Sequence, residues 1–131
     1  LNITDEKIPA SLVHEVIRQV ASDLGTNLVQ VQIFADLDER RYICYVEPAL
    51  ETPQLNPGLI AEKVHQQLSK VCMTYNFFSD LQKLLKPLRI IEMKQGWQNS
   101  IYETGIKKTG SATQVKIPVM IREKADDDWI K

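Results

Sequence analysis

The residues best placed to do chemistry are a lysine and the small, hydroxyl-bearing residues just before it. Gly110, Ser111 and Gln114 precede Lys116, and Pro118 follows it. Small residues beside a lysine let backbone N–H groups approach phosphate oxygens closely, and the ammonium group offsets the phosphate charge. The pattern therefore indicates an anion-binding segment, and phosphate is the first anion to consider.

Positive charge is concentrated in the same part of the chain. Between Lys83 and Arg122 there are eight Lys or Arg residues and two acids, although the whole chain has a formal net charge of −1. Lys107 and Lys108 fall in the last turn of a predicted helix, where cations offset the negative C-terminal end. That explanation does not extend to Lys116, because it lies beyond the helix.

Other kinds of catalytic site find little support. His14 and His65 lie on different predicted helices without further ligands at metal-binding spacing, so no metal site is predicted. Asp36, Asp38 and Glu39 cluster in a predicted turn, where acidic residues are favoured for structural reasons. The chain has no nucleophile elbow, P-loop or dinucleotide-binding motif.

Composition indicates an ordinary globular domain. The 131 residues suit one domain, with 44% hydrophobic and 25% charged residues and a sequence pI of about 6.2. That pI argues against nucleic acid as a partner, and no apolar run or signal peptide indicates a membrane. Cys44 and Cys72 are expected to be reduced core residues of a cytoplasmic protein. The aromatic residues from Tyr75 to Phe78 are expected to seal a core or interface.

Hydrophobic spacing predicts two long amphipathic helices. The first begins near Pro9, which suits the first turn of a helix, and ends at Gly25. The second begins near Gly58, after a proline-rich loop, and runs to Val71. A shorter third helix, marked by Ile101, Tyr102 and Ile106, is predicted to end near Lys107 and Lys108.

Alternating apolar residues predict strands at 29–35 and 42–47, joined as a hairpin, and a third strand at 88–93. Gln30 and Gln32 alternate with apolar residues in the first strand. We therefore expect that strand to have one face in contact with water.

This order of elements predicts an α+β fold. The expected architecture is a two-layer sandwich, in which a small, mostly antiparallel sheet carries helices on one face, close to a split βαβ arrangement. A strand at 1–3 can precede the first helix, 115–121 should be extended, and 126–128 should begin a frayed acidic tail. Eight residues with helical or alternating spacing are predicted to form the core: Val16, Ile17, Val20, Ile33, Tyr45, Val64, Leu68 and Ile90.

Several motifs resemble one known family. Pro87-Leu88-Arg89-Ile90, Lys94-x-Gly96 and Gln114-x-Lys116-x-Pro118 are similar to the C-terminal part of the auxin-responsive Gretchen Hagen acyl acid amido synthetases. These are adenylate-forming enzymes related to acyl-CoA synthetases. The family's Tyr-x-x-x-x-Glu strand is matched by Tyr42 to Glu47, and residues 1–7 resemble the segment that joins its two domains.

The chain departs from the family pattern close to the lysine. Val115 stands where an aromatic residue is usual, Val119 replaces the arginine after Pro118, and Thr109-Gly110 replaces Gly-Ala. The resemblance therefore implies a divergent, bacterial member that keeps the lysine.

The resemblance implies that residues 1–131 are the mobile C-terminal lid of a larger enzyme, and that this chain alone does not catalyse. The implied cofactors are ATP and Mg²⁺, bound mostly by an N-terminal adenylation domain, and the implied substrates are a small carboxylic acid and an amino acid. Lys116 is the expected catalytic residue, with Gly110, Ser111, Gln114 and Lys94 contacting the nucleotide. Two alternatives remain open: the lid of an acyl-CoA ligase, and a stand-alone small-molecule-sensing or interaction module.

Overall fold

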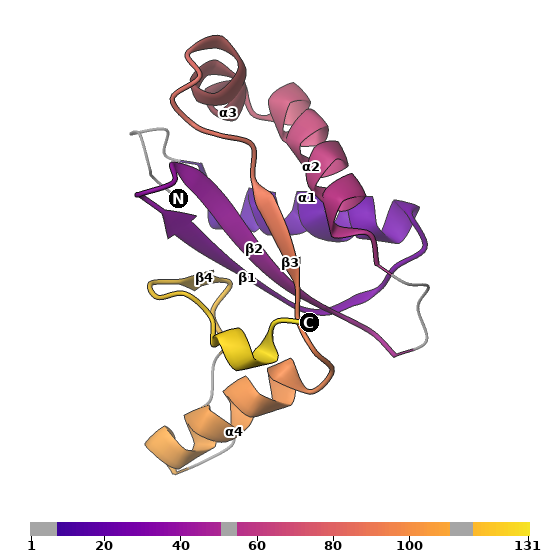
Figure 1. Ribbon diagram of the computed structural model, residues 1–131, viewed down its shortest axis with the longest axis vertical. Coiled ribbons are helices and arrows are strands. Elements are labelled where there is room, and N and C mark those ends of the chain that lie inside the picture. Colours follow the sequence, from indigo (N-terminus) through magenta and orange to yellow (C-terminus); the bar gives the residue numbers. More distant parts are fainter. Residues whose placement is uncertain (1–7, 51–54, 111–116) are drawn as a thin grey trace.

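A four-stranded open sheet runs through the middle of the computed structural model (Figure 1). The structure describes residues 8–50, 55–110 and 117–131, with the backbone alone at 108 and 109. The strands are β1 (Leu28–Asp36), β2 (Arg41–Pro48), β3 (Arg89–Glu92) and β4 (Met120–Ile121), in the order β3-β2-β1-β4. The helices are α1 (Ala10–Asp23), α2 (Pro57–Val71), α3 (Met73–Asn76), the π-helix η1 (Phe77–Leu81), α4 (Trp97–Thr109) and the 3-10 helix η3 (Asp127–Trp129).

The sheet is mixed. Its central hairpin of β1 and β2 is antiparallel, whereas β3 joins β2 and β4 joins β1 in parallel. The acidic turn of the hairpin has the structural role that its composition predicted. One carboxylate oxygen of Asp36 accepts hydrogen bonds from the N–H groups of Asp38 at 3.1 Å and Glu39 at 3.0 Å. The strand order and directions, together with the helices, confirm the α+β two-layer class, with parallel strands at both edges of the sheet.

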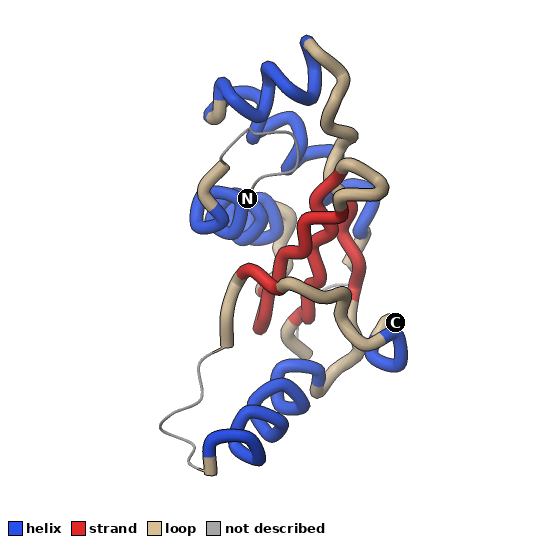
Figure 2. Tube along the Cα trace, turned by 90° about the vertical axis from the view of Figure 1, so that its left-hand side faces the viewer, coloured by secondary structure: helices blue, strands red, loops and turns tan. Residues whose placement is uncertain are grey.

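One face of the sheet carries the main core, against which α1 and α2 pack. All eight predicted core residues are buried, and Ile17 of α1 and Leu68 of α2 are 0% exposed. Figure 2 shows α1 end-on beside the strands, with α4 below them. The two long helices lie where the sequence predicted them, and the apolar stripe of each helix faces this sheet.

The other face of the sheet is also covered, contrary to the expectation from the sequence. The prediction that one face of β1 is in contact with water was wrong, since Gln30 is 8% and Gln32 is 5% exposed. A second apolar cluster lies on this face, made of residues from the strands, the start of α4 and the C-terminal segment: Ile43, Tyr45, Met93 and Trp97, with Phe34, Ile91, Ile101, Ile121, Ala125, Trp129 and Ile130 packed against them. The residues that cover this face come from α4 and the C-terminal segment, which are distant in sequence from β1 and β2.

The acidic tail was likewise expected to be frayed and is ordered instead. Asp126 caps η3 by accepting a hydrogen bond from the Asp128 N–H group at 3.0 Å. Ile130 then pairs with Met93 next to β3, and the Lys131 ammonium group lies 2.8 Å from a carboxylate oxygen of Glu92. These contacts hold the C-terminal residues against the sheet.

The two cysteines and Tyr75 are buried, as predicted, whereas Phe77 is not. Cys44 and Cys72 are free and buried, and burial raises the pKa of the Cys44 thiol to about 12. Tyr75 is fully buried, as expected for a core residue, while Phe77 is 45% exposed. The possible strand at 1–3 lies outside the described residues.

Candidate functional site

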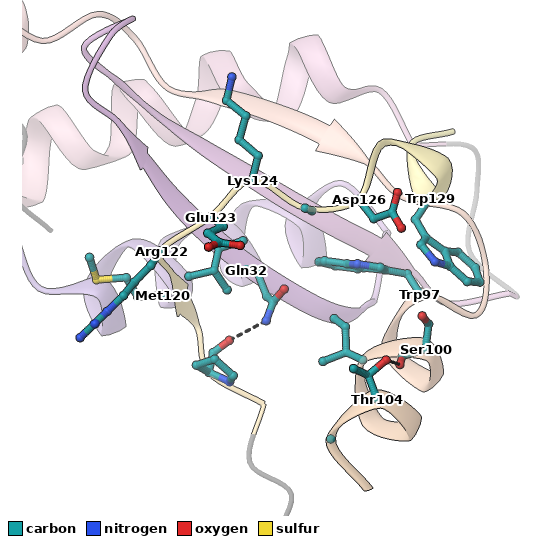
Figure 3. A pocket seen from close by; sticks show the side chains of 15 residues that line it. Gln32, Trp97, Ser100, Thr104, Met120, Arg122, Glu123, Lys124, Asp126 and Trp129 are labelled. Carbon is teal, nitrogen blue, oxygen red and sulfur yellow. Dashed lines mark hydrogen bonds between the residues drawn. The ribbon is translucent and has the colours of Figure 1, made fainter. Parts of the chain in front are cut away.

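An open groove of about 810 Å³ separates α4 from the segment that contains β4 (Figure 3). Ser100 and Thr104 lie on the α4 wall, and Met120 lies on the opposite wall. Gln32 reaches the groove from β1, where its side-chain amide donates a hydrogen bond to the Pro118 carbonyl oxygen at 3.0 Å. The groove is therefore bounded by two elements attached to the sheet at different places.

At its N-terminal end, α4 is held by aromatic packing. Gly96 takes a left-handed conformation with a φ of 95°, and an added Cβ atom would lie 3.5 Å from the Trp129 ring. Trp97 is 3% exposed and packs against Tyr45 with ring centroids 6.3 Å apart. The left-handed turn therefore favours glycine at position 96, whereas an added Cβ atom would make only an ordinary van der Waals contact with the Trp129 ring.

Lys94, one of the residues expected to contact a nucleotide, lies beside this end of α4. Its backbone N–H group donates to the Trp129 carbonyl oxygen at 2.7 Å, and its ammonium group donates to the Asp128 carbonyl oxygen at 2.8 Å. In this structure, Lys94 thus ties the C-terminal segment to the start of α4.

Gly110 lies at the opposite end of α4, where it forms the C-cap. Its φ is 74°, and its N–H group donates to the Ile106 carbonyl oxygen at 2.7 Å. Since thirteen residues of helix span roughly 20 Å, the structure does not bring Gly110 together with Lys94. Lys107 is exposed in the last turn, as the helix-end explanation predicted.

Lys116, Ser111 and Gln114 lie outside the described residues. In the sequence they fall between Gly110 and Pro118, which lies on the groove. The groove is therefore one of the described features of the molecule that adjoin the segment with the most chemically promising residues, beside a smaller pocket lined by Ile117.

In the sequence, Glu47 was noted only as the end of the family's Tyr-x-x-x-x-Glu strand, and its contact with α4, which the structure shows, was not predicted. Its carboxylate accepts hydrogen bonds from the N–H groups of Gly96 and Gln98 at 3.3 and 2.6 Å. A signal was present, because a buried acidic residue at the end of an apolar strand needs a partner.

Both histidines have protein partners, in keeping with their prediction as structural residues. The ring of His65 is hydrogen-bonded to the Tyr75 hydroxyl at 2.7 Å and to an Asp80 carboxylate oxygen at 3.1 Å. His14 accepts a hydrogen bond from the Arg18 guanidinium group at 3.0 Å. Burial, and secondly the charge of Arg18, lowers the pKa of His14.

Within the described ranges, no three His, Cys, Asp or Glu side chains are grouped so that they could hold a metal ion. Each helix in those ranges is also too short or too polar to cross a membrane.

Comparison with known proteins identifies the family. The family model for the GH3 family C-terminal domain matches residues 11–125. The chain therefore belongs to this family, as the motifs indicated. No curated protein matches the sequence.

The fold is similar to that of solved acyl acid amido synthetases. One structure, described as GH3.15 acyl acid amido synthetase, superposes with a TM-score of 0.73 over 95% of this chain, at 15% identity. A second, AtGH3.15 acyl acid amido synthetase in complex with 2,4-DB, gives a TM-score of 0.70 over 88% of this chain, also at 15% identity. The matches cover 24% and 21% of those two proteins, so this chain spans about a quarter of their length.

Proposed function

We propose that this chain is the mobile C-terminal lid of an ATP-dependent acyl acid amido synthetase. The observation that carries the proposal is the family match over residues 11–125, supported by a fold shared with an amido synthetase. Because the chain spans about a quarter of that relative, catalysis also needs a large N-terminal adenylation domain. The chain alone is not catalytic.

The proposed reaction has two steps. A carboxylate oxygen of the acid attacks the α-phosphorus of ATP, which forms an acyl-adenylate and releases pyrophosphate. The amine of an amino acid then attacks the acyl carbon, so that an amide forms and AMP leaves. Between the two steps the lid changes its position, as closing domains do in many enzymes.

The described residues do not form a nucleotide site by themselves. The Gly110 N–H group is engaged by Ile106. Gly110 also lies at the negative end of the helix dipole, which disfavours phosphate. The Lys94 ammonium group already donates one hydrogen bond, to the Asp128 carbonyl oxygen. The proposal therefore assigns ATP and Mg²⁺ mainly to the adenylation domain.

Within the lid, Lys116 is the proposed catalytic residue. It supplies positive charge where negative charge develops on phosphate oxygens, with Ser111 and Gln114 beside it in the sequence. Gly110 and Lys94 lie at opposite ends of α4, so the two do not form one phosphate site together.

The test is carboxylate-dependent exchange of labelled pyrophosphate into ATP by the full-length protein, across a panel of acids that includes 2,4-DB. Exchange that depends on the acid, followed by amide formation with an amino acid, is the expected result. Failure of every acid would overturn the adenylating function. A thioester formed with coenzyme A, and no amide, would replace the proposal with an acyl-CoA ligase.

A further inference from the structure

We propose that Glu47 is a positioning residue, which sets the direction in which α4 leaves the sheet and thereby the width of the groove. Its consequence for catalysis rests on the proposed function, because α4 leads through Gly110 into the sequence segment that contains Lys116. The inference itself rests on contacts between described residues.

The N-terminal end of α4 depends on Glu47 for its cap. The residue at the N-cap position is Gly96, which has no side chain to accept a hydrogen bond. Glu47, 49 positions earlier and 4% exposed, accepts instead from the N–H group of Gly96 at 3.3 Å and from that of Gln98 at 2.6 Å. A carboxylate at this point satisfies two unpaired donors and opposes the positive end of the helix dipole.

Further hydrogen bonds surround the same joint. Gln95 donates from its side-chain amide to the Pro48 carbonyl oxygen at 2.9 Å, next to Glu47. Gln98 donates from its side chain to the Gln30 side-chain oxygen at 3.3 Å. The ends of β1 and β2 thus bind the first turn of α4 through polar side chains in a largely buried setting.

The rest of α4 has little contact with the sheet. Trp97 is the one buried residue of the helix among those whose side chains are described, and the later described positions are either exposed or half-buried. Figure 1 shows α4 projecting below the strands. Because the helix is held at one end and is roughly 20 Å long, a tilt of about 10° at the joint displaces its far end by about 3 Å.

That displacement is large compared with what catalysis tolerates. Ser100 and Thr104 move with α4 and form one wall of the groove, whereas Met120 stays with the sheet. Misplacement of a catalytic group by about 1 Å can lower a rate by on the order of 10²-fold. Loss of the Glu47 carboxylate should therefore slow the reaction without removing any group that touches substrate.

Glu92 provides a matched control. It lies on the neighbouring strand β3, its side chain is 12% exposed, and its carboxylate is paired with Lys131 at 2.8 Å. Glu92→Gln therefore removes a carboxylate charge from a hydrogen-bonded glutamate near the same end of the sheet, but leaves the cap of α4 in place.

The experiment compares Glu47→Gln and Glu92→Gln in the full-length protein. Amide hydrogen exchange in a peptide spanning 94–100 should become faster by on the order of tenfold in Glu47→Gln only, as expected for loss of a helix cap. With the acid that gives the fastest pyrophosphate exchange, the same variant should lose on the order of 10²-fold in kcat at nearly unchanged KM. In a Lys116→Ala background, Glu47→Gln should cause little further loss, because its effect acts through the placement of that lysine.

Each outcome decides a different point. Unchanged hydrogen exchange in Glu47→Gln, or the same increase in Glu92→Gln, would overturn the positioning role. Full additivity with Lys116→Ala would show that Glu47 acts independently of the lysine, and would also overturn it. If Lys116→Ala is itself without effect, the proposed catalytic lysine fails, while the hydrogen-exchange comparison still judges whether Glu47 holds α4.

Discussion

At the scale of single residues, the polar groups of this domain divide into those that are hydrogen-bonded within the fold and those assigned to catalysis. Lys94, Gly110 and Glu47 each make hydrogen bonds that hold α4 or the C-terminal segment in place. Sequence spacing alone does not separate the two groups, because a lysine or glycine can equally contact a phosphate or a neighbouring carbonyl. Lys116 remains the residue assigned to chemistry.

Replacement of Lys116 by alanine in the full-length enzyme should separate activity from stability. The thermal midpoint should hardly change, because surface substitutions away from special features usually alter stability by less than about 0.5 kcal/mol. One half-reaction, adenylation or amide formation from supplied acyl-adenylate, should slow by on the order of 10²–10³-fold, as for loss of one preorganised charged group. Lys107→Ala, at the exposed end of α4, is the control and should do far less. Wild-type rates in both half-reactions for Lys116→Ala would contradict the assignment.

Asp36 gives a prediction for pH. The hydrogen bond from the Glu39 backbone, and then the Lys124 ammonium group 3.7 Å away, hold the pKa of its carboxyl below the ordinary value of 3.8, although partial burial opposes this. The ionised form is thus favoured in the folded state, and its stabilising effect, complete above the ordinary pKa, is lost as pH falls through the lowered value. Asp36→Asn should be less stable than wild type near neutral pH, and the difference should shrink as the pH is lowered well below the ordinary pKa of 3.8. Denaturant midpoints at neutral pH and at the lowered pH check this, and an equal gap at both would contradict it.

At the scale of elements, the sequence predicted what depends on local periodicity. The apolar stripes of α1 and α2 and the hairpin of β1 and β2 were found where expected, since each repeats an apolar position with its own period. The exposure of Gln30 and Gln32 was predicted wrongly, because alternation separates two faces by chemistry but does not say what later covers them. Here α4 and the C-terminal segment cover the polar side.

The same reasoning explains why the groove, and the hydrogen bonds that hold the start of α4, were not predicted. Glu47 meets Gln98 across 51 positions, and Lys94 meets Asp128 across 34. No periodic pattern encodes contacts of that separation. The lysine-containing segment was recognised through its motif, whereas the helix that leads to it owes its direction to long-range hydrogen bonds.

Two core substitutions test the packing of α1 and α2. Ile17 and Leu68 are both 0% exposed and belong to the main core cluster. Ile17→Ala and Leu68→Ala should each lower the free energy of unfolding by roughly 2–5 kcal/mol, since removal of buried methyl groups leaves a cavity. Leu81→Ala, at a position that is 66% exposed on η1, is the control and should cost much less. Unchanged denaturant midpoints for the first two variants would refute the core assignment.

At the scale of the whole molecule, the domain presents two different ends. The helices α2 and α3 lie at one end of its long axis, and α4 lies at the other (Figure 1). The groove lies beside α4. The main core joins the first end to the sheet, whereas the second end is joined by the smaller cluster around Trp97 and by the cap from Glu47. The end proposed to act on the substrate is thus attached more sparsely than the rest of the fold.

This organisation predicts that nucleotide binding belongs to the complete enzyme. On the described residues, Gly110 has its N–H group engaged and Lys94 donates to Asp128, so the domain offers no built phosphate site there. The 131-residue chain should therefore bind ATP or pyrophosphate with a Kd of about 1 mM or weaker, which corresponds to about 4 kcal/mol or less. Titration calorimetry of this chain, beside the full-length protein as the positive control, measures the difference. Circular dichroism of the same sample establishes that the chain is folded. A folded chain that binds either ligand with micromolar affinity would contradict the lid, and would favour a self-contained sensing module instead.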